Sequence, residues 1–297
     1  MTTTLAARVA PLLPVRLVAA TARLVYPRFE PELARLADLC PPGCGTAVDV
    51  GGWYGPWTHR LAARARQVVA LEPVPRLARL LSSGAPRNVR VVGAAAADHH
   101  GTARLWLPAG DAGDRGVSSL VRRDIHARSV EVPCVTLDGL GLRDVGFVKI
   151  DTDGGELAVL RGAETLLRRD SPALFVELES RIQPIAPVVG HLAARGYAGW
   201  VLPGDTWLPL DIFPLAEHQA RTCHVAAHGL LRRVLPPRGP RYVNSVLFLP
   251  DGRRPDGPGM RDDGRHARRP SRRPVHPARL PAGPAAPHGR PQRRPGR

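Results

Sequence analysis

Short apolar runs alternate with stretches of helical character over most of the chain. Runs bounded by glycine, proline or charge are typical of strands, whereas apolar residues three or four positions apart are typical of helices. The predicted strands are 46–51, 67–72, 89–96, 101–107, 130–137, 147–150, 173–176, 197–202 and 242–249. The predicted helices are 30–39, 56–66, 74–83, 156–168 and 187–195. Because strands and helices alternate, we expect an α/β fold with a doubly wound, mostly parallel sheet of the Rossmann-like kind.

A glycine-rich turn follows the first predicted strand. The strand runs into Asp49, the turn contains Gly51, Gly52 and Gly55, and the next strand ends in Glu72. Strand, glycine turn, helix, strand and acid in this order are typical of a nucleotide-binding βαβ unit. Glycines let a ligand lie against main-chain N–H groups, and a carboxylate at the position of Glu72 can accept both hydroxyl hydrogens of a ribose. The pattern therefore predicts a nucleoside-sized site, with an ordinary βα turn as the alternative.

The spacing of these glycines favours one class of ligand. Dinucleotide folds use G-x-G-x-x-G to place a pyrophosphate on a helix N-terminus. This chain instead has D-x-G-G-x-x-G from Asp49 to Gly55. An acid before the first glycine is of little use to a bound anion, but it is placed where the ammonium group of a cofactor can be bound. We therefore expect S-adenosylmethionine, a zwitterion that carries a sulfonium, rather than NAD.

Charged residues gather at and after the predicted strand 147–150. Lys149 lies in this strand, Asp151 and Asp153 follow it, and Glu177 follows the predicted strand after that. Ligands bind at the carboxyl ends of parallel strands, so these side chains are candidates for the site of a second substrate. Lys149 is also the only lysine among 42 basic residues. The alternative is local, with Asp153 or Thr152 capping the following helix and Asp151 paired with Lys149.

Asp98 ends the predicted strand 89–96. This run is nearly all apolar, as a strand buried on both faces should be. The position lies beside the cofactor pocket of a doubly wound sheet, so we predict a contact with adenine, with a solvated turn as the alternative. The polar, glycine-rich residues 110–128, which include Ser118 and Ser119, are predicted to form a loop over the site.

Basic charge is concentrated at the C-terminus. The net charge is +16, and residues 251–297 hold 13 Arg and 4 Asp, which gives +9. Because this stretch is rich in Pro and Gly and has few large apolar residues, we predict a disordered tail. Its arginines are not interleaved with aromatic residues for base stacking, so we expect no specific nucleic-acid partner. The predicted organisation is a helical lead-in at 1–45, one domain at 46–250 and the tail at 251–297.

No apolar run is long enough to span a bilayer. Residues 5–26 come closest, but arginines and prolines interrupt them, so we predict amphipathic helices that pack on the domain. Four cysteines in a chain of this size do not make a secreted disulfide framework, and we expect reduced thiols in the cytoplasm. His224 and His228 share a predicted helix face, but no carboxylate or second cysteine completes a set, so we predict no metal site there.

Several segments in a fixed order resemble the FkbM-type methyltransferases. The turn DVGGWYGPWT stands where the family has D-V-G-A-N-x-G, and LEP follows the second strand. Next come AAADHHGTARLWL, Ser-Ser-Leu at 118–120, VTLD at 135–138, KIDTDGGELAVLRGAE and a Glu after the strand 173–176. The resemblance covers about residues 45–180, with a fainter echo in YVNSVLFLP. Trp53 stands where the family usually has Asn, and Asp153 where it usually has Glu.

This resemblance implies a class I methyltransferase fold with an antiparallel last strand. It also implies S-adenosylmethionine as the methyl donor and a small-molecule acceptor, most often a hydroxyl of a secondary metabolite or sugar. Carried over by position, the cofactor-binding residues are Asp49, Gly51, Gly52 and Gly55 at the methionine end, Glu72 at the ribose and Asp98 at the adenine. The residues that the resemblance places toward the acceptor are Lys149, Asp151 and Asp153.

Methyl transfer to a hydroxyl calls for a base that takes the hydroxyl proton. Asp151 is the first candidate, Glu177 and Asp153 are the next, and Lys149 is expected to orient Asp151 or to lower the pKa of the acceptor. Mg²⁺ held by these carboxylates could do the same work, but the sequence does not fix three converging ligands. Two other classes stay open. One is a nicotinamide-dependent oxidoreductase, although no Tyr-x-x-x-Lys pair is present, and the other is a non-catalytic binding protein with a degenerate cofactor loop.

Overall fold

The computed structural model describes residues 15–28, 30–40, 43–109, 116–227, 241–250 and 252–255, which all belong to one compact unit. The strands are β1 (Cys44–Val50), β2 (Ala65–Leu71), β3 (Val89–Val92), β4 (Ala95–Ala96), β5 (Gly101–Pro108), β6 (His126–Val135), β7 (Val145–Ile150), β8 (Ala173–Glu177), β9 (Tyr197–Val201), β10 (Leu208–Pro209) and β11 (Ser245–Pro250). The α-helices are α2 (Val15–Val25), α3 (Pro31–Ala34), α4 (Leu36–Leu39), α5 (Pro56–Ala62), α6 (Pro75–Ser83), α7 (Glu156–Arg161), α8 (Glu164–Asp170), α9 (Ala186–Ala193) and α10 (Leu215–Ala227). Short 3₁₀ turns are η2 (Tyr26–Arg28), η4 (Asp138–Leu140) and η5 (Leu210–Ile212).

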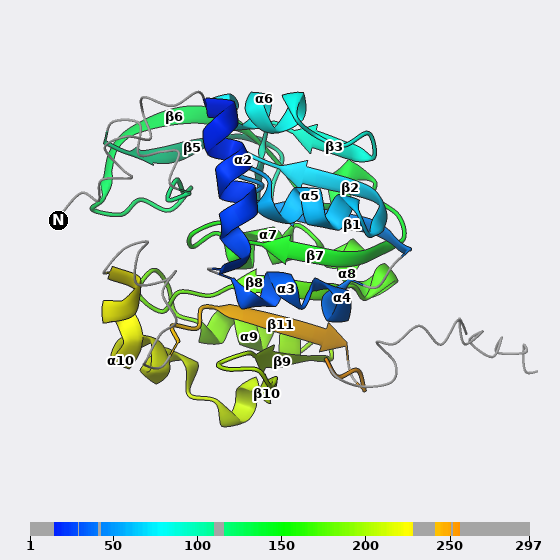
Figure 1. Ribbon diagram of the computed structural model, residues 1–297, viewed down its shortest axis with the longest axis vertical. Helices are drawn as coiled ribbons and strands as arrows, with labels where there is room; N and C mark the ends of the chain where they lie inside the picture. The colour runs from blue at the N-terminus through cyan, green and yellow to red at the C-terminus, as the bar shows by residue number, and fades with distance from the viewer. Residues whose placement is uncertain are drawn as a thin grey trace, which may run out of the picture. The chain divides into compact units, whose positions relative to one another are not determined.

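The main sheet has eight strands in the order β10-β9-β11-β8-β7-β1-β2-β3 (Figure 1). Strands β3, β2, β1, β7 and β8 run parallel, whereas β11 runs antiparallel to β8 and to β9. This is the doubly wound order of the class I methyltransferases, with its antiparallel last strand. The predicted fold class is therefore confirmed.

Helices cover both faces of this sheet. Val48 and Val148 face a core that includes residues of α7, α8 and α9. Their neighbours Ala47 and Phe147 face a second core with residues of α3, α4 and α5. Successive residues of a strand point to opposite faces, so a strand with helices on both sides is apolar throughout. This explains why the central strands appear in the sequence as continuous apolar runs.

The predicted strand 89–96 is divided in two, so its prediction was wrong. Its first half is β3, an edge strand of the main sheet that is only half buried. Its second half, β4, pairs with β6 in a separate three-stranded sheet of order β4-β6-β5. β3 thus lies at the edge of the main sheet, where its residues are only partly covered. The strands predicted at 101–107 and 130–137 are confirmed as β5 and β6, although β6 begins at His126, inside the predicted loop.

The predicted helix 156–168 breaks into α7 and α8. The carbonyl of Gly162 accepts the N–H of Asp138 at 2.9 Å instead of continuing the helix. The carboxylate of Asp138 then accepts the N–H groups of Thr165 and Leu166, each at 2.8 Å, in the first turn of α8. A long-range side chain therefore starts a new helix where the local pattern continues one. The predicted helix 30–39 is likewise divided, into α3 and α4.

Within the described ranges, no helix has the length and apolarity that crossing a membrane requires. The four cysteines are free thiols. His228 and residues 256–297 lie outside the described residues, so the disorder of the tail stays a prediction.

Candidate active site

The carboxyl ends of β1, β7 and β8 meet in the middle of the main sheet. In the strand register, Asp49 of β1 lies opposite Lys149 of β7. Asp151 follows β7 directly, and Glu177 ends β8. The sheet thus brings the predicted residues of two separate sequence stretches to one edge. Together with Asp153, these five residues are called the charged edge below.

Lys149 lies at the centre of the charged edge and is 5% exposed. Its ammonium donates to the carbonyl of Gly51 at 2.9 Å and lies 3.3 Å from Asp151 Oδ2 and 3.6 Å from Asp49 Oδ1. Burial by itself would lower the pKa of Lys149, but the surrounding carboxylates, first Asp151 and then Asp49, outweigh it and raise the pKa. Through these contacts, charged Lys149 links the glycine turn to the end of β7.

Asp49 is fully buried, and its two oxygens face different partners. Oδ2 accepts the hydroxyl of Thr58 at 2.5 Å, whereas Oδ1 faces Lys149 in an ion pair and makes no hydrogen bond. Burial raises the pKa of Asp49, against the effect of the lysine. These contacts hold the turn in place from below. The assignment of Asp49 to the ammonium of a cofactor stays a prediction.

The glycines of the turn are packed closely by the rest of the fold. Gly51 has a φ of +80°, and a Cβ on it would lie 2.1 Å from the carbonyl oxygen of Asp151. A Cβ on Gly52 or Gly55 would lie 2.8 or 2.7 Å from the side chain of Leu81 on α6. The turn thus has a packing reason for its glycines in addition to any ligand.

Glu72, at the end of β2, is 4% exposed and is held by main-chain donors. Oε2 accepts the N–H of Trp53 in the glycine turn, and Oε1 accepts the N–H of Val74, each at 2.8 Å. Burial raises the pKa of Glu72 to about 7, although these hydrogen bonds lower it. Trp53 has a φ of +47°, and its ring packs between Tyr26 and Tyr54, with centroids 5.6 and 4.7 Å away. The carboxylate therefore lies against the turn, and its assignment to a ribose stays a prediction.

Asp151 and Asp153 differ in exposure and in partners. The side chain of Asp151 is 26% exposed and pairs with Lys149, whereas that of Asp153 is 14% exposed and its Oδ2 accepts from Arg123 at 3.0 Å. Burial, followed by the charge of Asp151, raises the pKa of Asp153 to about 7 in spite of the arginine. Asp151 is thus the more accessible of the two acids, whereas Asp153 is paired with Arg123 of a neighbouring segment.

Neither acid caps α7, which begins after Gly155 without a side-chain cap. Instead, the carboxylate of Glu156 folds back and accepts from the N–H and hydroxyl of Thr152 and the N–H of Gly154. The alternative in which Asp153 caps the helix was therefore wrong, while the pairing of Asp151 with Lys149 is present.

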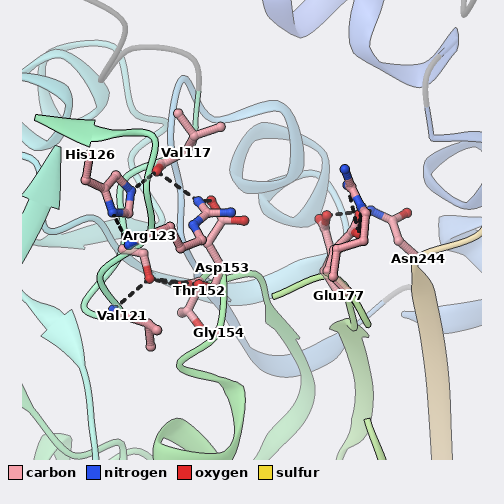
Figure 2. Close-up of polar contacts among 12 residues, drawn as sticks. Val117, Val121, Arg123, His126, Thr152, Asp153, Gly154, Glu177 and Asn244 are labelled. Carbon is pink, nitrogen blue, oxygen red and sulfur yellow. Dashed lines mark hydrogen bonds and ion pairs between the residues drawn. The ribbon is translucent and has the colours of Figure 1, made fainter. Parts of the chain in front are cut away.

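The segment before β6 is fastened onto the loop after β7 (Figure 2). Ser119 Oγ donates to the carbonyl of Asp153 at 2.8 Å. Arg123 donates to the carboxylate of Asp153 and to the carbonyl of Val117. His126 Nδ1 accepts the N–H of Arg123, so Nε2 carries the ring proton and donates to the carbonyl of Val117 at 2.9 Å. This part of the predicted loop thus lies against the charged edge, while residues 110–115 are outside the described ranges.

Glu177 lies on the other side of Asp153 in Figure 2 and is held by Asn244. Asn244 Nδ2 donates to Glu177 Oε1 at 2.5 Å and to Glu179 Oε1 at 3.2 Å, and the hydroxyl of Tyr242 donates to Glu179 at 2.5 Å. Burial and the charge of Asp151 raise the pKa of Glu177 well above its usual value. Asn244 and Tyr242 precede β11 and belong to the stretch YVNSVLFLP, but the sequence did not indicate their contacts with these acids.

Glu30 is a further acid of the site that the sequence did not indicate. Its Oε2 accepts from the indole N–H of Trp57 at 2.6 Å, and its Oε1 accepts from the hydroxyl of Tyr26 at 3.1 Å. Burial raises the pKa of Glu30 to about 7. The ring of Tyr26 packs on Trp53, which places Glu30 beside the glycine turn. A single acid before a proline carries no sign of a site, so only the tertiary structure reveals it.

The model of the methyltransferase FkbM domain matches residues 44–198, which is more than half of the chain. The chain belongs to the FkbM methyltransferase family. Comparison with curated proteins gave no match.

Several solved structures are similar to the chain at low identity. The FkbM methyltransferase of Methylobacillus flagellatus KT is 14% identical over 69% of this chain and 43% of its own, with a TM-score of 0.40, so the chain spans less than half the length of that structure. Precorrin-6y C5,15-methyltransferase of Geobacter metallireducens GS-15 is 13% identical over 73% and 85%, with a TM-score of 0.40. Precorrin 8w decarboxylase of Methanobacterium thermoautotrophicum is 15% identical over 74% and 89%, with a TM-score of 0.38.

The FkbM match begins at β1 and ends within β9. It contains the glycine turn, Glu72 and the charged edge, but not Glu30 or Asn244. The residues of the turn fit the donor of S-adenosylmethionine-dependent methyltransferases, because the buried carboxylate of Glu72 lies against the glycine turn through its hydrogen bond from Trp53.

Asp98 of this FkbM domain lies away from the main sheet. It follows β4 in the small sheet, its side chain is 44% exposed, and its Oδ1 lies 2.8 Å from His99 Nδ1. This contact with His99 lowers the pKa of Asp98. Its predicted contact with adenine is not tested by these observations and stays a prediction.

Among the residues that the structure describes, no group of three or more His, Cys, Asp or Glu side chains is arranged to hold a metal ion. The side chain of His224 and all of His228 are outside the described part, so the absence of a site there stays a prediction.

Proposed function

We propose that this FkbM-family chain transfers the methyl group of S-adenosylmethionine to a hydroxyl of a small secondary metabolite or sugar. The observation that carries the proposal is the contact between the two predicted sites. The ammonium of Lys149 donates to Gly51 of the turn and lies 3.3 Å from Asp151, the accessible acid of the charged edge. A donor in the turn and an acceptor at Asp151 are therefore neighbours.

In this proposal the cofactor is held by residues of the first half of the domain. Glu72 accepts hydrogen bonds from the ribose hydroxyls, and the turn with Gly51, Gly52 and Gly55 binds the methionine end. Asp98 lies on the adenine side. Asp49 supports the turn indirectly, through its contacts with Thr58 and Lys149. When bound, S-adenosylmethionine supplies a methyl group activated by its sulfonium.

Asp151 then serves as the general base. The acceptor oxygen forms a bond to the methyl carbon as the bond from carbon to sulfur breaks, and the hydroxyl proton moves to the Asp151 carboxylate. Lys149 orients this carboxylate and keeps it at the end of β7. Much of the acceleration comes from holding the acceptor oxygen in line with the methyl group. Asp153 and Glu177 are the alternative bases.

Asp151→Asn tests the proposal in the full-length chain with radiolabelled S-adenosylmethionine and a panel of hydroxylated metabolites and sugars. We expect kcat to fall by about 10²-fold or more, because the amide cannot take the proton. Binding of S-adenosylhomocysteine should be retained in calorimetry. The exposed Asp211→Asn is the matched control and should leave both quantities unchanged. An unaltered rate in Asp151→Asn would remove Asp151 from the role of base.

A parallel titration with NADH separates the rival classes. Binding of S-adenosylhomocysteine alone supports the methyltransferase, binding of NADH supports the oxidoreductase, and binding of neither supports a non-catalytic protein. We propose a cytoplasmic location as part of the same function, supported by the four free thiols.

A further inference from the structure

Two segments outside the FkbM match contact the site, since Tyr26 packs on Trp53 of the glycine turn and Asn244 donates to Glu177 of the charged edge. Tyr26 and Glu30 come from the chain before residues 44–198, and Asn244 comes from the chain after them. The glycine turn and Lys149 lie within the matched residues, whereas these flanking side chains lie outside them. The contacts that hold the two flanking segments together therefore affect the part of the site where the acceptor would bind.

A buried ion pair joins the two flanks. Glu32 is fully buried, and both of its oxygens accept from Arg241 Nη2, at 2.7 and 2.5 Å. Arg241 Nη1 also donates to the carbonyl of Leu202 at 2.6 Å, at the end of β9. The carbonyl of Arg241 lies 2.7 Å from His218 Nε2 on α10. The arginine is thus anchored on two elements of the domain and holds the lead-in against them.

Each partner of this pair lies a few residues from a side chain of the site. Glu32 follows Glu30, which is bonded to Trp57 and Tyr26. On the other flank, Arg241 precedes Asn244, which donates to Glu177. One ion pair therefore fixes both flanking segments close to the side chains that they contribute to the site.

The packing of Trp57 places Glu30 on the face of the sheet that carries Glu177. The ring of Trp57 lies 4.8 Å from that of Phe175, between centroids. Phe175 and Glu177 are two residues apart in β8, so their side chains point to the same face. The indole N–H of Trp57 donates to Glu30, so this packing also fixes the position of Glu30 in the lead-in.

We propose that Glu32 and Arg241 are a positioning pair for the acceptor. The pair fixes the two segments that carry Glu30 and Asn244 and so sets the direction in which Glu177 meets the bound acceptor. Neither residue touches the reacting atoms. The inference rests on the proposed methyl transfer and adds to it the contacts that set the orientation of the acceptor.

The variant to test is the double substitution Glu32→Gln with Arg241→Met. Removing one charge alone would leave the other buried without a partner, which strongly destabilises proteins, whereas removing both avoids this. The matched control is Glu164→Gln with Arg195→Met. In that pair Arg195 Nε lies 3.0 Å from Glu164 Oε2, between α8 and α9, and its contacts in the described chain do not involve the charged edge.

Two measurements on the full-length protein decide the matter. First, kcat/KM for the acceptor should fall on the order of tenfold or more in the test variant, because the acceptor is held out of line, while its affinity for S-adenosylhomocysteine is unchanged. Second, the indole N–H resonance of Trp57 in a ¹H–¹⁵N spectrum, assigned with Trp57→Phe, should shift. The control variant should alter neither the kinetics nor the resonance.

The inference is overturned if the folded test variant keeps both its kcat/KM and its Trp57 resonance. It is also overturned if cofactor affinity falls in parallel with kcat/KM, since the effect would then be general. If the wild-type chain methylates no hydroxylated acceptor, the proposed function is wrong. The Trp57 resonance still decides in that case whether the ion pair positions Glu30.

Discussion

Lys149 and Asp49 lie opposite each other on neighbouring parallel strands, with Nζ and Oδ1 3.6 Å apart and side chains 6% and 0% exposed. Two charges taken out of water this completely stay favourable only as a pair, since each loses its hydration. The same ammonium donates to the carbonyl of Gly51. The pair therefore couples the stability of the sheet to the shape of the cofactor turn.

Lys149→Met should destabilise the protein strongly. It leaves the Asp49 carboxylate buried without its counter-charge, and we expect the free energy of unfolding to fall by roughly 3–5 kcal/mol. The measurement is urea denaturation followed by tryptophan fluorescence. Adding Asp49→Asn to Lys149→Met should recover a large part of the loss, because no uncompensated charge then remains. Wild-type stability in the single variant would contradict this account.

The arrangement of strands follows from local patterns. Val48 and Val148 belong to short apolar runs, and a strand covered by helices on both faces is apolar at every position. The glycine turn and the acids after β7 were also predictable, because the carboxyl ends of parallel strands gather at one edge. These features depend on near neighbours in the chain.

Features that depend on distant neighbours were not predictable. The helix 156–168 breaks because Asp138, far away in the chain, bonds to Gly162 and caps the next helix. Similarly, Glu30 and Asn244 enter the site through contacts with Trp57 and Glu177. No periodicity or spacing in the sequence encodes such pairings. The sequence therefore predicted the glycine turn and the charged edge, but not the contacts of Glu30 and Asn244.

Gly51→Ala and Gly43→Ala form a matched pair that separates backbone strain from steric conflict. Both glycines have a φ near +80°, at +80° and +77°, but a Cβ on Gly43 meets nothing within 4 Å, whereas one on Gly51 lies 2.1 Å from the Asp151 carbonyl. Gly43→Ala should therefore cost about 1–2 kcal/mol, the price of a left-handed conformation. Gly51→Ala should cost about 1–3 kcal/mol more, because atoms must move apart.

Urea denaturation of both variants gives these costs, and calorimetry with S-adenosylhomocysteine gives their effect on the site. We expect Gly43→Ala to keep wild-type affinity and Gly51→Ala to lose it, since the turn and the end of β7 must separate. Equal stability of the two variants would mean that the turn relaxes freely. The close contact between the turn and Asp151 would then not matter to the fold.

Glu72 should give the unliganded protein a stability that falls as pH rises. Its folded pKa is about 7, above the ordinary value near 4.3 of an unfolded glutamate. The folded protein thus holds a proton that the unfolded chain releases between these values. The contribution of Glu72 is present below about pH 4.3 and is lost as pH rises through 7. Glu30 and Asp153 act in the same direction. The melting temperature should therefore be lower at pH 8 than at pH 6, and less so in Glu72→Gln.

Binding of the cofactor product should show the opposite dependence on pH. Ribose hydroxyls donate hydrogen bonds and so favour the ionised carboxylate of Glu72. With a pKa of about 7, that form is a minor fraction at pH 6 and the major one at pH 8, so the affinity for S-adenosylhomocysteine should rise roughly tenfold over this interval. Glu72→Gln should bind more weakly at pH 8 and lose the pH dependence in calorimetry. A variant that kept the wild-type slope would show that another group titrates, and the ribose would then have to be assigned to a different residue.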